Sequence, residues 1–449
     1  MQAIHFDRLL TADGWRTDIS VEITAGRIAA LVPGRLPGAP SHRIGLPGLP
    51  NLHSHAFQRG MAGLAETRGA GPDSFWSWRE VMYRFALAMT PEDVEAVAAE
   101  VYVEMLEAGF TRVGEFHYLH HAPDGSPYDD PAEMAARIAA AAATSGIGLT
   151  LLPVFYARSG FSGDRAGPEQ RRFACDLDLY ERLLAASRHV VAGLDGAHVG
   201  VAPHSLRAAS PEELLAVTAL ADGQPIHIHV AEQMREVEDC VAQRGARPVA
   251  WLLDHAPVDR RWCLIHATHM TDAESGAMAR SGAVAGLCPV TEANLGDGIF
   301  DAPRFLASGG RIGIGTDSNV SVDAAGEMRQ LEYSQRLARR ARNVLAAAGQ
   351  STGAALVDHV VEGGHAALGQ PQAGLAVGGP ADIVSLDADH PALAGHRDET
   401  ILDAWVFGAG AALVDCVWTR GRLQVEGGRH HARNLVRRRF SAAMARLAG

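Results

Sequence analysis

Two histidines one residue apart, His53 and His55, are the first side chains in the sequence that could bind one metal ion together. They close an apolar run, residues 44–52, that predicts a buried strand, although its prolines weaken this interpretation. Residues i and i+2 of a strand point to the same side. Both imidazoles could therefore converge at the end of the strand, but this pair alone is a weak signal.

Further histidines and carboxylates follow the other short apolar runs of the sequence. The predicted strands are residues 44–52, 111–117, 148–155, 197–203, 225–229, 262–266, 283–287 and 311–315. The chemistry-bearing residues at strand ends are His53, His55, Glu115, His117, Tyr118, His204, His227, His229, Glu232, His266 and Asp317. A lone histidine at a strand end is usually a hydrogen-bonded structural residue. Groups of this kind at the ends of six strands indicate a single site.

Helical stretches alternate with these strands, at residues 91–108, 131–145, 211–221 and 328–346. Proline opens the first three, after the expected N-caps Thr90, Asp130 and Ser210. Eight strands with crossover helices predict an α/β fold, a closed (β/α)8 TIM-like barrel. Catalytic groups of such barrels lie at the carboxyl ends of the strands. An open doubly wound sheet is the alternative, but no GxGxxG motif follows an early strand.

The two ends of the chain share a different pattern, in which apolar and polar residues alternate around turns. It covers residues 20–32 near the start and residues 381–386, 414–418 and 423–425 near the end. We expect both ends to build one small composite β-sandwich domain. The expected domains are residues 1–46, the first part of the β-domain; 47–370, the (β/α)8 barrel; and 371–449, the second part of the β-domain with a terminal helix.

Length and composition narrow the class of protein. The 449 residues allow two or three domains, and the net charge of −12 argues against binding nucleic acid. Five scattered cysteines without a CxxC motif do not describe a disulfide framework. We find no signal peptide and no apolar run of the ~18 residues that a membrane helix needs. We therefore expect a cytoplasmic protein with no nucleic-acid or membrane partner. The net charge does not argue against a small anionic substrate, because a pocket can be locally basic. We also expect a homodimer.

The predicted ligands of the metal are His53, His55, His229 and Asp317. Three neutral imidazoles and a carboxylate suit zinc, with iron possible. All 40 residues counted as Lys+Arg are arginine, so no carbamylated lysine can bridge two metals. We therefore expect one divalent metal ion per chain.

Three side chains are predicted to work beside the metal, which lowers the pKa of a bound water to about 7. Glu232 lies three residues after His229 and is the expected proton shuttle. His266 is expected to orient the water or to stabilise the developing charge. Asp317 is expected both to bind the metal and to hydrogen-bond the nucleophile.

This order of residues resembles the amidohydrolase superfamily: HxH, a fifth-strand histidine followed by x-x-Glu, a sixth-strand histidine and an eighth-strand aspartate. The resemblance covers nearly the whole chain, and the His-x-x-Glu form is similar to that of the mononuclear deaminases. Five longer segments, residues 51–59, 74–79, 114–118, 202–207 and 291–298, resemble the N-formimino-L-glutamate deiminases of histidine degradation. The resemblance implies hydrolysis of that substrate to N-formyl-L-glutamate and ammonia.

The implied substrate carries two carboxylates and a cationic formimidoyl group. Guanidinium groups bind carboxylates in a bidentate manner, so Arg79 and Arg207, expected in loops near strand ends, are predicted to bind it. Gln58 and Tyr118 are expected to add hydrogen bonds. His204 is expected to contact the substrate.

Two other functions stay open at this point: a related deaminase acting on a purine, pterin or triazine ring, and a catalytically inactive scaffold of the same fold. Residues 63–75, rich in glycine, are a candidate lid or a plain connector. We interpret His120 and His121 as loop residues, and residues 429–431 as exposed polar surface, rather than as metal ligands.

Overall fold

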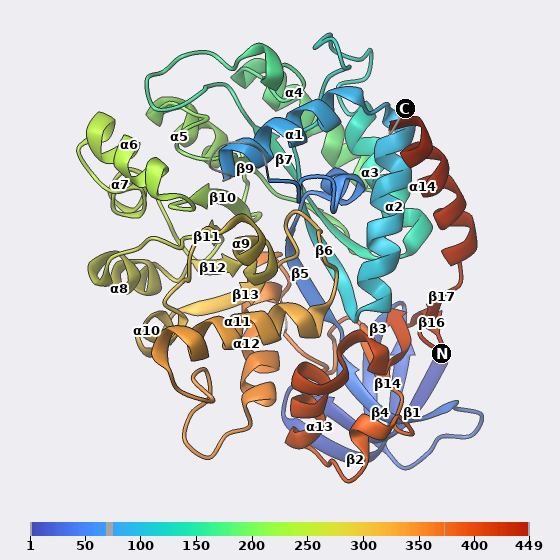
Figure 1. The fold of residues 1–449 in the computed structure, drawn as a ribbon. Coiled ribbons are helices and arrows are strands. Elements are labelled where there is room, and N and C mark those ends of the chain that lie inside the picture. The colour runs from blue at the N-terminus through green and yellow to red at the C-terminus, as the bar shows by residue number, and fades with distance from the viewer. Residues whose placement is uncertain (1, 69–74, 372, 448–449) are drawn as a thin grey trace.

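The computed structural model describes residues 2–68, 75–371 and 373–447. In this part of the chain, parallel strands occupy eight positions around a ring, and helices pack around it (Figure 1). The strands are β5 (Leu49–Ser54), β6 (Phe110–His117), β7 (Gly148–Phe155), the short pair β8 (His198–Val199) and β9 (Ala202–Pro203), β10 (Ile226–Val230), β11 (Trp262–His266), β12 (Val284–Leu287) and β13 (Arg311–Ile314).

The ring closes through pairings between single residues. Strands β5 to β8 form one parallel sheet and β10 to β13 another. A bridge between Ser54 and Asp317 joins β5 to the segment after β13, and a bridge between Val201 and Ile226 joins the fourth position to β10. The closed (β/α)8 barrel is therefore confirmed, and the open doubly wound sheet is excluded.

Helices connect and cover the strands of the barrel. Their bounds are α1 (Phe75–Ala88), α2 (Pro91–Glu107), α3 (Glu133–Ser145), α4 (Leu177–Val191), α5 (Pro211–Ala219), α6 (Met234–Arg244), α7 (Pro248–His255), α8 (Asp272–Ser281), α9 (Pro289–Leu295), α10 (Ala302–Ala307), α11 (Ala324–Arg339), α12 (Thr352–Ala367), α13 (Glu399–Ala404) and α14 (Arg433–Leu447). Among the described residues, none of these helices is long and apolar enough to cross a membrane.

The two ends of the chain meet in one sheet, drawn at the bottom of Figure 1. Its strands are β1 (Gln2–Thr11), β2 (Gly14–Thr24), β3 (Arg27–Pro33), β4 (Ser41–Pro47), β14 (Ile383–Leu386), β15 (Val414–Thr419), β16 (Arg422–Glu426) and β17 (Arg429–His430). Strand β4 runs antiparallel to β14, with Gly45 opposite Ser385. Phe6, Val21 and Trp418 belong to a core separate from that of the barrel. The composite domain is confirmed; the limits at 46/47 and 370/371 stay predictions.

The single strand predicted over residues 44–52 is wrong. Strand β4 ends at Pro47 in the terminal sheet, and β5 begins at Leu49 in the barrel. Gly48 lies between them, and a Cβ atom there would come within 2.2 Å of the Thr111 side chain. Both strands are buried, so one continuous apolar run hides the change of sheet.

Other predicted elements also differ from the structure. The fourth strand breaks into β8 and β9 around Gly200, where a Cβ atom would lie 2.5 Å from the carbonyl oxygen of Pro225. The helix predicted over 328–346 runs instead over Ala324–Arg339, because Asp323 caps it and accepts a hydrogen bond from the amide of Ala325. Helix α3 begins two residues later than predicted.

Close packing of α12 against the barrel gives a test of the fold. A Cβ atom on Gly363 would lie 1.9 Å from the carbonyl oxygen of Ile312, a contact that only a backbone shift can relieve. We expect Gly363→Ala to lower the free energy of unfolding by about 1–3 kcal/mol. The matched control is Gly276→Ala in α8, where a Cβ atom would meet only the end of the Arg280 side chain, at 3.3 Å. Urea unfolding of both variants checks this, and equal stability of the two would contradict it.

Candidate active site and metal centre

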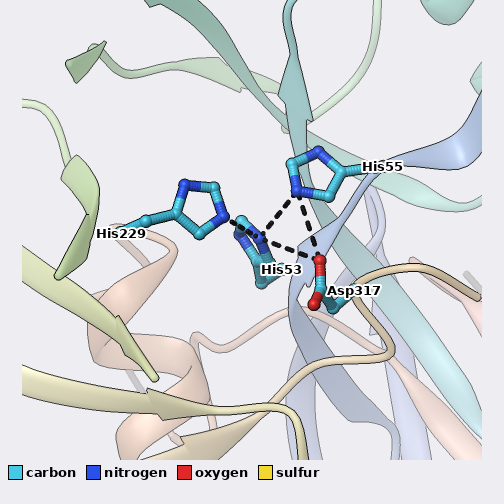
Figure 2. Close-up of side chains that lie close together, drawn as sticks. All are labelled: His53, His55, His229 and Asp317. Atoms are coloured by element: carbon cyan, nitrogen blue, oxygen red, sulfur yellow. Dashed lines mark hydrogen bonds and ion pairs between the residues drawn. The ribbon is translucent and has the colours of Figure 1, made fainter. Parts of the chain in front are cut away.

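Four buried side chains converge at the carboxyl end of the barrel, as Figure 2 shows. Nε2 of His53 lies 3.2 Å from Nε2 of His55 and 3.0 Å from Nε2 of His229. Oδ1 of Asp317 lies 3.4 Å from Nε2 of His53 and 3.2 Å from Nε2 of His55. They come from the ends of β5 and β10 and from the segment after β13. These are the four predicted ligands, and three ring nitrogens facing one another beside a carboxylate fit a divalent cation.

The backbone fixes which ring nitrogen faces the centre. Nδ1 of His55 lies 3.0 Å from the carbonyl oxygen of Phe116, and Nδ1 of His229 lies 3.1 Å from that of His204. A carbonyl oxygen only accepts, so each Nδ1 carries the proton and each Nε2 presents a lone pair. Burial lowers the pKa of His53 to about 3, which keeps its ring neutral. Neutral imidazoles are the form that binds a metal.

Two of the site residues have left-handed backbones: φ is 64° at His266 and 47° at Asp317. Such angles are uncommon for residues other than glycine, so other contacts must hold them. The amide of Asp317 donates to the carbonyl oxygen of His53, and the amide of His55 donates to that of Asp317. The side-chain amide of Asn319 donates to the carbonyl oxygens of His55 and Asp317. Asn319 thereby links the end of β5 to the segment after β13. No motif in the sequence distinguishes this residue.

Carboxylates surround His266 on both sides of its ring. Nδ1 lies 3.2 Å from Oε1 of Glu292, and Nε2 lies 3.7 Å from Oε1 of Glu232 and 3.8 Å from Oδ2 of Asp317. Burial opposes a charge on this ring, but these carboxylates outweigh it and raise the pKa of His266 to about 10. Sequence reasoning missed the contact of Glu292, on α9, although residues 291–298 carry part of the family resemblance.

A cavity opens over this group. All five predicted substrate-binding residues line it: Gln58, Arg79, Tyr118, His204 and Arg207. Glu232, His266 and Asp317 line it as well. The structure thus brings the proposed binding, proton-transfer and metal-binding side chains to one space.

The two arginines reach the cavity from different elements. Arg79 lies on α1, not in a loop as predicted, and its guanidinium carbon lies 4.6 Å from the ring centre of Trp76. Arg207 lies in the loop after β9, as predicted, with Nη2 3.6 Å from Oε2 of Glu232 and Nε 3.8 Å from Oε2 of Glu236. The sequence of α1 shows no feature that says which of its faces lines the cavity, so Arg79 could not be placed correctly.

Aromatic residues complete the cavity wall, and sequence reasoning missed most of them. Trp78, Tyr83, Tyr156 and Phe173 line it together with Tyr118. Tyr156 directly follows β7, so reading the end of the third strand in the same way as the others would have found it. The hydroxyl of Tyr118 accepts a hydrogen bond of 2.8 Å from Nε2 of Gln58.

Three histidines that we did not expect to bind the metal make structural contacts. His120 and His121 lie in the loop after β6, as predicted, and each ring bonds a backbone carbonyl oxygen, of Val154 and Ala174. The exposed surface predicted at residues 429–431 is wrong for His430, which is 1% exposed and bonds the carbonyl oxygen of Ser145 at 2.8 Å. It is buried because β17 pairs with β16 beside the end of α3. Residues 69–74 of the candidate lid, 63–75, lie outside the described residues.

Comparison with known proteins identifies the family of the chain. Residues 44–423 match the model of the amidohydrolase family, and residues 1–44 match that of the N-terminal domain of the formimidoylglutamate deiminase HutF. The chain is 48% identical to a formimidoylglutamate deiminase of Pseudomonas aeruginosa over 100% of both chains. It is 30% identical to a 5-methylthioadenosine/S-adenosylhomocysteine deaminase of Nitratidesulfovibrio vulgaris, over 86% of this chain and 80% of the other.

Solved structures show the same architecture. An amidohydrolase from Brucella melitensis superposes with a TM-score of 0.97, at 56% identity over 100% of both chains. A zinc-bound adenosine deaminase from Xanthomonas campestris has a TM-score of 0.84 at 22% identity, over 100% of this chain and 98% of the other. The chain therefore belongs to the amidohydrolase family and, within it, to the formimidoylglutamate deiminases.

Proposed function

We propose that this protein hydrolyses N-formimino-L-glutamate to N-formyl-L-glutamate and ammonia, a step of histidine degradation. The chain is a hydrolytic deiminase acting on a C–N bond, as its family shows. The choice of substrate rests on one observation. Arg79 and Arg207 line the same cavity as Glu232 and Asp317. Two guanidinium groups suit a substrate with two carboxylates better than they suit a neutral purine, pterin or triazine ring.

We propose that His53, His55, His229 and Asp317 hold one divalent metal ion. The ion is zinc, because three imidazoles and one carboxylate are ligands that suit zinc. When bound, such an ion acts as a Lewis acid and makes water a nucleophile at neutral pH. One ion per chain, the homodimer and the cytoplasmic location stay predictions from the sequence.

Glu232 is the proposed proton shuttle. Its carboxylate lines the cavity and lies 3.7 Å from Nε2 of His266. It takes a proton from the attacking water as the oxygen bonds to the formimidoyl carbon, and delivers a proton to the departing nitrogen. The C–N bond to this protonated nitrogen then breaks as the added hydroxyl loses its remaining proton to solvent and becomes the carbonyl oxygen. Ammonia leaves, and the formyl group stays on the glutamate nitrogen. A protonated His266 beside Glu232 stabilises the negative charge on the shuttle before the transfer.

Replacing each arginine by methionine tests the proposed substrate. Charge-assisted hydrogen bonds contribute about 1.5–3 kcal/mol, so each loss should lower kcat/KM for N-formimino-L-glutamate roughly 10–150-fold. The metal content should stay unchanged, because neither Arg79 nor Arg207 belongs to the predicted ligand group. Steady-state assays of ammonia release measure the first effect, and elemental analysis measures the second.

A truncated substrate, N-formiminoglycine, provides the control. It lacks the side-chain carboxylate, so the arginine that binds this group should lose most of its importance with the truncated compound. Guanine and adenosine should release no ammonia above background. If both methionine variants lose the same activity on both formimino compounds, the arginines support the fold, and the proposed substrate loses its basis.

A further inference from the structure

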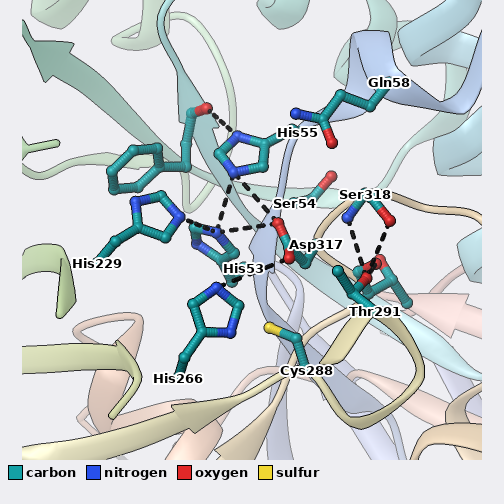
Figure 3. Close-up of polar contacts among 12 residues, drawn as sticks. His53, Ser54, His55, Gln58, His229, His266, Cys288, Thr291, Asp317 and Ser318 are labelled. Atoms are coloured by element: carbon teal, nitrogen blue, oxygen red, sulfur yellow. Dashed lines mark hydrogen bonds and ion pairs between the residues drawn. The ribbon is translucent and has the colours of Figure 1, made fainter. Parts of the chain in front are cut away.

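A second group of metal-ligating side chains lies beside the first and shares one residue with it. It consists of His266, Cys288 and Asp317, whose ligand atoms lie within 4.8 Å of one another in a fully buried position. They come from the ends of β11 and β12 and from the segment after β13, three neighbouring positions of the barrel. Figure 3 shows the sulfur of Cys288 directed toward the space between His266 and Asp317.

Asp317 offers a different oxygen atom to each group. Its Oδ1 faces Nε2 of His53 and of His55, at 3.4 and 3.2 Å. Its Oδ2 faces Nε2 of His266, at 3.8 Å. A carboxylate that divides its oxygens in this way can bridge two cations. It could replace the carbamylated lysine, which this lysine-free sequence cannot form.

One carboxylate also fixes the other two members of the second group. Oε1 of Glu292 lies 3.2 Å from Nδ1 of His266 and accepts a 2.9 Å hydrogen bond from the backbone amide of Cys288. This contact occupies Nδ1 and leaves Nε2 of His266 to face Asp317 and Glu232. The orientation of the imidazole is therefore set, as it is for histidines that bind metals.

From this geometry we infer a second, inhibitory site for a thiophilic divalent ion such as zinc, held by Nε2 of His266, Sγ of Cys288 and Oδ2 of Asp317. The inference rests on the proposed one-metal site. One sulfur, one nitrogen and one oxygen atom suit zinc as ligands. The ligand atoms of a tetrahedral zinc site lie about 3.5 Å apart. Modest shifts of the three side chains would therefore bring their ligand atoms to the distances that zinc requires. On binding, the thiol of Cys288 and Nε2 of His266 each release a proton.

Occupancy of this site removes groups that the proposed reaction uses. His266 would no longer stabilise the charge on Glu232, and Asp317 would be held by two cations. Cys288 is 0% exposed and does not line the cavity, so an ion reaches it past His266 and Asp317, which do. Excess metal should therefore inhibit the enzyme, with activity falling roughly tenfold when free zinc is about ten times the dissociation constant of the second site.

Cobalt substitution distinguishes the two sites without any substrate. The first equivalent of Co2+, bound by nitrogen and oxygen, should give no thiolate-to-cobalt charge-transfer band in the near ultraviolet. The second equivalent should produce this band, with two ions per chain by elemental analysis and loss of ammonia release. Cys288→Ala should keep the activity of the one-metal enzyme, bind only one ion, show no band and resist excess Co2+ or Zn2+.

Cys263→Ala is the matched control. Cys263 is a buried cysteine of the same apolar cluster as Cys288, but its thiol belongs to none of the metal-ligating groups that the described residues form. This variant should behave as the wild type. The inference is overturned if the wild type binds a single ion in excess Co2+ without a thiolate band, or if Cys288→Ala is inhibited as strongly as the wild type. A band that titrates in protein without activity on N-formimino-L-glutamate would instead count against the proposed function alone.

Discussion

Replacing Glu232 by glutamine should abolish turnover while leaving the metal and the bound substrate in place. The amide matches the carboxylate in shape but cannot accept and return a proton. General acid–base groups contribute roughly 10²–10⁴-fold, and Glu232 is proposed to handle two transfers, so kcat should fall by at least about 10²-fold. The backbone amide of Glu232 still donates to Oε2 of Glu236 in the variant, so the loop keeps its anchor.

Single-turnover ammonia release and substrate binding to the variant would separate these effects. Glu238→Gln, the same change at an exposed position of α6, is the matched control and should keep wild-type kcat. A Glu232→Gln enzyme within about tenfold of the wild type would remove Glu232 from the proton transfer. An unchanged kcat with a raised KM would instead assign it to substrate binding.

Loss of the metal should follow from His229→Ala. Nε2 of His229 lies 3.0 Å from Nε2 of His53, and removing the ring takes away one of four donors and leaves an open space beside a buried carboxylate. Bound metal per chain should fall from one equivalent to nearly none after dialysis against a weak chelator, and activity should fall with it. Elemental analysis and ammonia release on the same preparations measure both.

His227→Ala is the control for this change. His227 lies two residues earlier on β10 and is buried too, but its Nε2 bonds the carbonyl oxygen of Ala367 at 2.8 Å. This variant should lose stability and keep the metal, because the ring is not one of the proposed ligands. Full retention of metal by His229→Ala would show that the ion binds elsewhere.

Strand ends were the most reliable guide from sequence to site. In a closed barrel the carboxyl ends of all strands face one space, so locating the strands also located His53, His229 and Asp317. Arg79 was different: its place on α1 depends on which face of that helix packs toward the cavity. The buried ring of His430 likewise depends on a pairing between β16 and β17 that only the folded chain defines.

Sequence reasoning failed where two environments give the same local pattern. Residues on both sides of Gly48 are apolar because each side is buried, although in different sheets. The contacts of Glu292 and Asn319 could not be predicted from the sequence, for a different reason. Glu292 contacts His266, 26 residues earlier, and Asn319 donates to Ser54, 265 residues earlier. Residue spacing carries no information about partners at such distances in the sequence.

The terminal sheet has a consequence for how this protein is made. Gly45 of β4 pairs with Ser385 of β14, so the ribosome must produce most of the chain before β4 gains this neighbour. Until then the buried side chains of Ile44 and Leu46 lack part of their covering, and only Gly48 separates β4 from the strand that leads to His53. Contacts this distant in sequence form late, because the loop they close is long. A chain that ended before β14 would thus leave β4 with β1 as its one partner in the terminal sheet, and the first barrel strand would begin beside an unpaired edge.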